Sequence, residues 1–241
     1  MLLPALGKAK EAGKIALCTG NLKQINYGVA EYLNSNDDVY FGGGAPFTTG
    51  PWPCFLADRR SCGCPSIPDP ALRYNLIPHS IMFCPSTGNS CKSWPSAINA
   101  DYLKREYSDY GYNNYTLGNP NNSPRRTHQG SERLSHVLQP SMQYVMMDVR
   151  KYHADNTIDD PPVGVANVYM GCANNLAMPD AVRHKGKTGI LYADGHVEAR
   201  PVSNPLDPYT EADLGVYSEF KNTAKKDGNG WSRNLNCLVY N

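Results

Sequence analysis

The sequence predicts an α+β protein in which a long N-terminal α-helix packs on an antiparallel β-sheet head with long loops. Three observations support this fold class: helical spacing of apolar residues near the N-terminus, a hairpin pattern over residues 188–200, and many glycines and prolines between them. We therefore expect residues 1–34 to form one helix and residues 35–241 to form a globular α+β head.

Apolar residues recur every three to four positions through residues 2–34, as they do in an amphipathic helix. The stripe consists of Leu2, Ala5, Leu6, Ala9, Ala12, Ile15, Leu22, Ile25, Val29, Tyr32 and Leu33. Within the segment, Gly13, Gly20 and Gly28 would each weaken the helix by up to roughly 1 kcal/mol relative to alanine. The polar run at 34–38 is expected to end the helix.

The stretch 188–200 has the pattern of a β-hairpin. Residues 190–193 are apolar and suit a buried strand, whereas residues 197–200 alternate between apolar and charged side chains, as in a half-buried strand. Between them, Asp194 and Gly195 both tolerate positive φ angles, so they are expected to form a two-residue turn.

The middle of the chain is expected to be rich in loops. Residues 35–80 contain many glycines and prolines, and residues 150–180 form a long insertion. Residues 81–86 and 144–148 predict strands, the second ending in an acid, and residues 210–224 predict a helix.

Composition excludes some functions. The 241-residue chain has a net charge of +1 and only 19% charged residues, so it lacks the basic field that nucleic-acid binding requires. No nucleotide-binding motif and no nucleophile–base pair is visible, so we expect that the protein is not an enzyme.

The eight cysteines allow two interpretations, disulfides or a zinc site. Disulfides are favoured because no paired C-x2-C knuckles are present, and the short loop between Cys84 and Cys91 makes these two residues the preferred pair. Cys18 lies in the predicted helix and is expected to be a free thiol. Cys54 would then pair with Cys62 or Cys64. The alternative zinc ligands are Cys54, Cys62, Cys64 and Cys84.

Polar residues around the hairpin suggest a second candidate site. His184, Asp194, His196 and Asp148 would form a ligand set for zinc or a similar ion if they converged. The other interpretation is a hydrogen-bonding lock. In it, the Asp194 carboxylate accepts from amides of the turn, and His184 bonds a backbone carbonyl or Asp194.

The tyrosines of the stretch 107–115 suggest a third candidate site. Tyr110, Tyr112 and Tyr115 are interpreted as exposed loop residues that pack on their own segment. Alternatively, they form a surface on which carbohydrate stacks.

Motifs at both ends of the chain resemble bacterial type IV pilin-like (prepilin-type) proteins. His184, nine further residues and then Asp194-Gly195 match the H-x9-DG signature near the C-terminus of that family. Leu-Leu-Pro-Ala-Leu at 2–6 and Asn-Leu-Lys-Gln-Ile at 21–25 are similar to the region that follows the membrane-spanning part of a prepilin-type N-terminus. Cys-Pro-Ser at 84–86 and Ser-x-Tyr-Gly-Tyr-Asn at 108–113 also resemble family elements.

The resemblance implies a pilin-like fold and a structural role. An apolar segment preceding Met1 would anchor the protein in the inner membrane, with the head in the periplasm or outside the cell, whereas the chain without that segment would be soluble. The implied function is that of a pilin-like or pseudopilin-like subunit of the cell envelope or of a type II secretion-type apparatus. Its partners would be other pilin-like subunits or secretion machinery.

No resident cofactor is expected, although some pseudopilins that resemble this class bind calcium in acidic loops. Asp155, Asp159 and Asp160 are the acids that would do so here. Two alternative functions remain at this point. One is an envelope-anchored module that binds glycans or proteins through its tyrosines, and the other is a metal-dependent enzyme that uses the His184, Asp194, His196 and Asp148 set.

Overall fold

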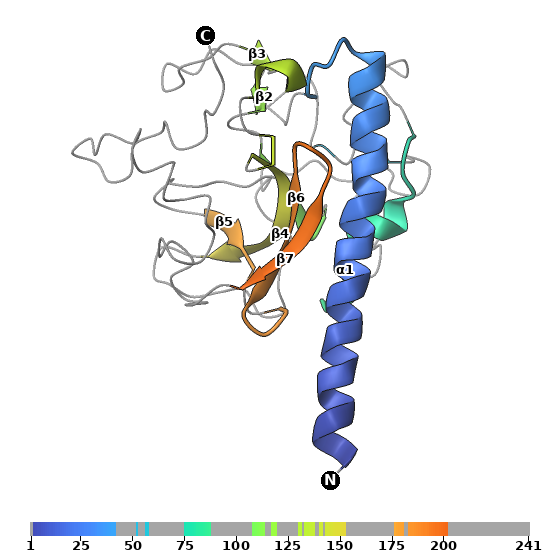
Figure 1. Cartoon of the computed structure of the whole chain (residues 1–241), viewed down its shortest axis with the longest axis vertical. Helices are drawn as coiled ribbons and strands as arrows, with labels where there is room; N and C mark the ends of the chain where they lie inside the picture. The colour runs from blue at the N-terminus through green and yellow to red at the C-terminus, as the bar shows by residue number, and fades with distance from the viewer. Residues whose placement is uncertain are drawn as a thin grey trace, which may run out of the picture.

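The structure is a computed structural model. It describes residues 2–41, 52, 56–57, 75–87, 108–113, 117–119, 130–131, 133–137, 140–141, 143–152, 176–180 and 183–201. Within these residues the protein has one long N-terminal helix that lies against an antiparallel sheet (Figure 1). The predicted α+β class is therefore confirmed.

The long helix α1 (Leu2–Ser35) is continuous over 34 residues, as predicted. Its C-terminal half faces the sheet through five buried residues that share one side of the helix. They are Cys18, Leu22, Ile25, Val29 and Leu33. The helix ends because Asp37 and Asp38 adopt positive φ angles of 52° and 60°, which lets the Asp38 N–H donate back to the Leu33 carbonyl at 3.0 Å.

Four strands form the main path of the sheet in the order β1-β4-β6-β7, and all the pairs are antiparallel. These strands are β1 (Tyr110–Tyr112), β4 (Tyr144–Tyr152), β6 (Lys187–Tyr192) and β7 (Val197–Pro201). A fifth strand, β5 (Leu176–Pro179), pairs with the second half of β4. Separately, β2 (Gly118–Asn119) pairs with β3 (Gly130–Ser131). Two 3-10 helices complete the described elements, η2 (His79–Met82) and η4 (Leu134–His136).

Three sequence predictions for the middle of the chain need correction. The strand predicted at 81–86 is instead the end of η2 followed by a turn, in which the Thr87 N–H donates to the Cys84 carbonyl at 3.1 Å. β4 continues past Asp148 to Tyr152, and β5 lies inside the stretch predicted as an insertion. The helix predicted at 210–224 lies outside the described residues.

The hairpin predicted at 188–200 is confirmed as β6 and β7, but its turn has three residues instead of two. The Gly195 N–H donates to the Tyr192 carbonyl at 2.9 Å, and the Tyr192 N–H donates to the His196 carbonyl at 3.0 Å. Gly195 alone in this turn has a positive φ, of 87°. This is the arrangement of a type I turn closed by a left-handed glycine. The Asn26 side chain of α1 donates to the Gly195 carbonyl at 3.4 Å, so the turn also contacts the helix.

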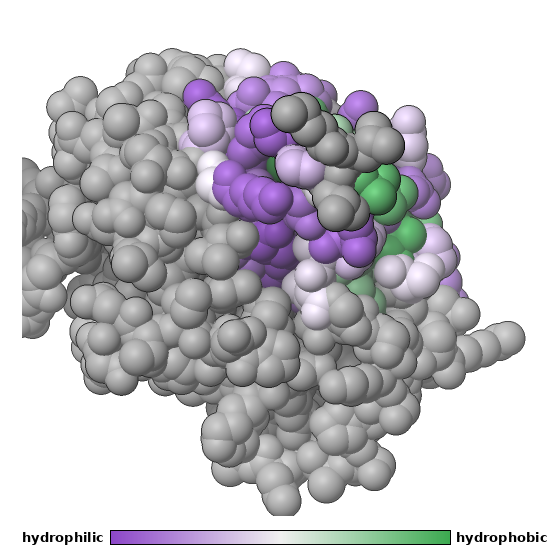
Figure 2. All heavy atoms as spheres, turned by 90° about the horizontal axis from the view of Figure 1, so that it is seen from below, coloured by the Kyte–Doolittle hydropathy of each residue, from purple (hydrophilic) through white to green (hydrophobic). Residues whose placement is uncertain are grey.

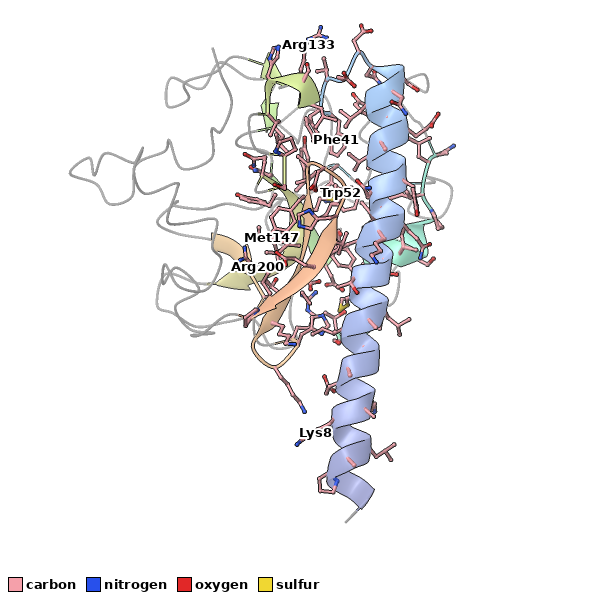
Figure 3. All side chains as sticks on the ribbon, viewed as in Figure 1. Lys8, Phe41, Trp52, Arg133, Met147 and Arg200 are labelled. Atoms are coloured by element: carbon pink, nitrogen blue, oxygen red, sulfur yellow. A yellow bond between two sulfur atoms is a disulfide. The ribbon has the colours of Figure 1, made fainter. Side chains whose placement is uncertain are left out.

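The core between α1 and the sheet contains aromatic side chains, two of which donate a hydrogen bond to a backbone carbonyl. Trp52 donates its indole N–H to the Tyr110 carbonyl at 3.0 Å, and Tyr112 donates its hydroxyl to the Phe41 carbonyl at 3.0 Å. Phe41 and Trp52 are seen between the sheet and the upper half of α1, while Lys8 lies far from them on the lower half (Figure 3). Among the described residues, no helix contains an apolar stretch long enough to cross a lipid bilayer.

Two helix glycines provide a matched test of how closely α1 packs. A Cβ on Gly28 would lie 2.5 Å from the Ile77 Cγ2 atom, whereas a Cβ on Gly20 would meet nothing within 4 Å. Gly28→Ala is therefore expected to destabilise the protein by roughly 1–3 kcal/mol through overpacking. Gly20→Ala is expected to stabilise it by up to about 1 kcal/mol through helix propensity. Urea unfolding of both variants checks the pair, and equal shifts would contradict the close packing of α1 on residue 77.

Candidate functional site

A buried group of charged and sulfur-containing side chains lies beside α1, below the aromatic core in the orientation of Figure 3. We call this group the junction cluster, because it joins the helix to the head. Its members are Cys18, Cys84, Asp109, Asp148, Asp180, Arg183 and His184. Each is at most 7% exposed, although five of the seven are ionisable side chains of the kind usually found at surfaces. A cluster of this kind requires specific partners, since an unpaired buried charge is strongly destabilising.

Cys18 of α1 and Cys84 of the turn after η2 form a disulfide that spans 66 positions of sequence, with their Cα atoms 5.4 Å apart (Figure 3). The predictions of a Cys84–Cys91 disulfide and of a free Cys18 are therefore wrong. The reason is geometric, because Cys18 lies on the same face of α1 as Leu22 and Ile25 and points into the head. Cys54, Cys62, Cys64 and Cys91 lie outside the described residues.

Arg183 is the cation at the centre of the junction cluster. Its Nε atom lies 2.9 Å from Asp180 Oδ2, and its two terminal nitrogens lie 3.7 Å from Asp148 Oδ1 and 3.8 Å from Asp109 Oδ1. The guanidinium also donates to the carbonyls of Val149 at 2.9 Å and Asp109 at 3.4 Å. A single buried guanidinium therefore holds three aspartates that come from separate parts of the head.

The cluster has more carboxylates than cations, and this imbalance affects its titration. Burial raises the pKa of Asp148 to about 7, although Arg183 and the N–H of Gly189 act to lower it. Burial would lower the pKa of Arg183, but Asp180, Asp109 and Asp148 raise it above its ordinary value. Arg183 therefore stays charged, whereas Asp148 changes protonation near neutral pH.

His184 lies between the disulfide and Asp148. Its Nε2 atom is 3.3 Å from Cys84 Sγ and 3.5 Å from Asp148 Oδ2, and its Nδ1 atom is 3.4 Å from Ser86 Oγ. Burial, followed by the charge of Arg183, lowers the pKa of His184 to about 4. The imidazole is therefore neutral at pH 7, with one ring nitrogen facing the sulfur and the carboxylate.

Asp109 positions the turn that carries Cys84. Its Oδ2 atom accepts from the Cys84 N–H and from the Thr87 hydroxyl, each at 2.7 Å. The Ser86 N–H in turn donates to Cys84 Sγ at 3.4 Å. The sulfur is thus held by a backbone hydrogen bond in a turn whose own conformation is set by a buried carboxylate.

The sequence predicted that four polar residues would converge, and the structure brings only two of them together. Asp148 and His184 meet in the junction cluster, but Asp194 and His196 lie in the β6–β7 turn, at the opposite end of β6 from His184. There the Asp194 carboxylate accepts from the His196 N–H at 3.1 Å and lies 2.6 Å from His196 Nδ1. The strand separates the two halves of the motif, so the lock predicted between His184 and Asp194 is also wrong, whereas Asp194 does accept from a turn amide.

The tyrosine site is not a surface in the part of the chain that the structure describes. Tyr110 and Tyr112 are fully buried in β1, which corrects both the exposed-loop interpretation and the carbohydrate-stacking alternative for these two residues. The Tyr112 hydroxyl has a partner inside the core, and Tyr110 receives a hydrogen bond from Asn21 of α1 at 3.2 Å. Tyr115 and the proposed calcium ligands Asp155, Asp159 and Asp160 lie outside the described residues.

Sequence reasoning missed Asp109, Asp180 and Arg183 altogether, because no local pattern marks residues that meet only in the folded head. For Cys18 a local signal was available, since helical spacing places it on the core face of α1, but it was nevertheless expected to be a free thiol.

The fold and the junction cluster together define an α+β protein whose long helix is joined to an antiparallel sheet by a disulfide and buried ion pairs. Comparison of the chain with protein-family models, with curated proteins and with solved structures found no match. The assignment of the protein to the α+β class therefore depends on its own helix and sheet.

Two titrations in the cluster should have opposite effects on stability. The pKa of Asp148 is raised from 3.8 to about 7, so the folded state binds more protons than the unfolded state in that window, and stability falls as pH rises through it. The pKa of His184 is lowered from 6.5 to about 4, so the unfolded state binds more protons there, and stability falls as pH drops from 6.5 to 4.

Single variants separate these two contributions. Asp148→Asn should leave the histidine contribution, so that stability rises between pH 4 and 6.5. His184→Gln should leave the aspartate contribution, so that stability falls between pH 4 and 7. Urea unfolding midpoints across this range measure both slopes. Slopes of the same sign in the two variants would contradict the assigned protonation states.

Proposed function

We propose that this chain is a pilin-like or pseudopilin-like structural subunit of the bacterial cell envelope, or of a type II secretion-type apparatus. The observation that carries the proposal is the division of α1 into two halves. The C-terminal half contributes to the core, whereas residues 4–10 are exposed and the helix extends well past the sheet (Figure 1).

The free half of α1 lacks the tertiary contacts that normally stabilise a helix. Isolated helices shorter than about 12–15 residues are marginal in water, and most helical stability in proteins comes from packing of an apolar face. A second surface that covered the free half of α1 would supply the missing contacts, and it would explain why the helix extends beyond the core of the head. A membrane-anchored helix that packs among neighbouring subunits supplies such a surface.

A second apolar stripe on α1 supports the same proposal. Leu6, Leu17 and Tyr27 are 67%, 58% and 74% exposed. At 3.6 residues per turn they lie within about 80° of one another and about 120–160° from the centre of the core face. In the view from below, green apolar atoms are exposed among purple hydrophilic ones (Figure 2). We infer that these three side chains, which the core of the subunit leaves exposed, are available to a partner surface.

The outward stripe also contains Gly13 and Gly20, whose added Cβ atoms would meet nothing within 4 Å. The subunit's own packing therefore does not require glycine at these positions. Small residues let helices approach closely in membranes, where packing replaces the hydrophobic effect as the driving force. We infer that the occupant of this face is the corresponding helix of another pilin-like subunit.

Cell fractionation tests the membrane part of the proposal. We expect the product of the complete gene to stay with the membrane after alkaline extraction, and we expect an apolar run of about 20 residues to be encoded upstream of Met1. A complete gene product that is recovered entirely in the soluble fraction would overturn the proposal. The same gene expressed from Met1 onward serves as the matched control and should be soluble.

A further inference from the structure

The junction cluster contains a set of metal-ligating atoms that includes the two sulfurs. One ligand atom from each of Cys18, Cys84, Asp148 and His184 lies within 4.8 Å of the other three. In a tetrahedral zinc site with bonds of about 2.0–2.3 Å, neighbouring ligand atoms lie roughly 3.3–3.8 Å apart. The distances from His184 Nε2 to Cys84 Sγ and Asp148 Oδ2, 3.3 and 3.5 Å, already fall in that range.

Three of these four residues also accept or make hydrogen bonds of the kind that support metal ligands. The second nitrogen of His184 lies 3.4 Å from the Ser86 hydroxyl, so Nδ1 can carry the proton and leave Nε2 free to coordinate. The Ser86 N–H donates to Cys84 Sγ, and the Gly189 N–H donates to Asp148 Oδ2 at 2.8 Å. Hydrogen bonds of this kind orient ligands and favour the thiolate and carboxylate forms.

We propose that the same four residues bind a zinc ion when Cys18 and Cys84 are reduced, as a closed structural site with two thiolates, one imidazole and one carboxylate. Four protein ligands without an open position are typical of structural zinc. The burial of the site suits that role, since Cys18 and Asp148 have no exposed surface and Cys84 and His184 are at most 4% exposed. The disulfide and the zinc ion are then alternative links between α1 and the head.

The exchange between the two links balances chemically. A dithiol reductant transfers two electrons and two protons to the Cys18–Cys84 bond, which gives two thiols and the oxidised reductant. Zinc binding then replaces the two thiol protons, and the sulfurs have to move apart, because bonded sulfurs lie about 2.0 Å apart. The chain synthesised in a reducing compartment would hold zinc, and the chain in an oxidising compartment would hold the disulfide.

Zinc content measured in two redox states tests the proposal. The purified full chain is reduced with a phosphine, equilibrated with zinc, freed of unbound metal and measured by elemental analysis. Because other cysteines also bind zinc when they are reduced, the decisive quantity is the difference between variants. We expect wild type to hold one zinc ion more than His184→Gln and Asp148→Asn, and the oxidised wild type to lack this ion.

A further variant distinguishes coordination from folding. His184→Cys replaces one ligand with another, so it should retain the extra ion. With cobalt in place of zinc, it should also show a stronger thiolate-to-metal charge-transfer band than wild type. Equal zinc contents in reduced wild type and both ligand-removing variants would overturn the proposal. So would a cobalt spectrum that is the same in wild type and His184→Cys.

Discussion

Replacing Arg183 with methionine is expected to lower the free energy of unfolding by about 3–5 kcal/mol, the usual cost of breaking a buried ion pair from one side. Methionine keeps much of the length of the side chain but supplies no charge and no N–H. Asp109, Asp148 and Asp180 would then remain buried without their common cation. The carbonyl of Val149 would lose a hydrogen bond as well. Urea unfolding at pH 7 measures the effect.

Arg200→Met is the matched control for this prediction. Arg200 Nε lies 3.3 Å from Glu198 Oε1, but the two side chains are 32% and 44% exposed, so solvent screens the pair. Pairs of this kind contribute about 0–1 kcal/mol. Similar losses in the two variants would mean that Arg183 does not neutralise the buried carboxylates.

Removing the Cys18–Cys84 disulfide is the second large expected effect. For a separation of 66 positions, the chain-entropy relation gives about 4 kcal/mol of stabilisation through restriction of the unfolded state. The double variant Cys18→Ala and Cys84→Ala should lose approximately this amount relative to oxidised wild type. The bond also joins α1 directly to the turn after η2, so hydrogen exchange in α1 should increase in the variant.

A substitution next to Cys18 and a peptide map serve as controls for the disulfide variant. Thr19→Ala changes the next residue of α1, whose hydroxyl donates to the helix's own carbonyls of Ile15 and Ala16, and it should cost less than about 1 kcal/mol. Digestion without reduction should yield the peptide of Cys18 joined to the peptide of Cys84. A peptide that joins Cys84 to Cys91 would restore the pairing predicted from sequence and contradict the structure.

The parts of the fold that the sequence predicted are those set by local patterns. α1 follows from apolar spacing over many turns, and the β6–β7 hairpin follows from an apolar strand, a glycine turn and an alternating strand. Even there, the number of residues in the turn was wrong. Asp194 tolerates a positive φ, but Gly195 alone adopts one, and Ala193 joins the turn. The pilin-like assignment remains a proposal.

The junction cluster could not be predicted because its contacts connect residues that are distant in sequence. The expectation for Cys84 favoured the nearest cysteine, although a helix residue 66 positions away faces it directly. Tyr110 and Tyr112 were assigned to a surface because tyrosine combines an apolar ring with a polar hydroxyl, yet pairing of β1 with β4 places both in the core. The helical position of Cys18, on the face of Leu22 and Ile25, was the one available signal.

Site-specific crosslinking tests the central claim, that neighbouring subunits cover the outward face of α1. A photoreactive amino acid is placed at Leu17 on that face, and as a control at Arg133, which is exposed at the far end of the head (Figure 3). In cells that carry the complete gene, illumination should give adducts of twice the subunit mass from Leu17 and few from Arg133. A membrane-bound protein that gives no such adduct from Leu17, or gives as much from Arg133, would contradict the claim.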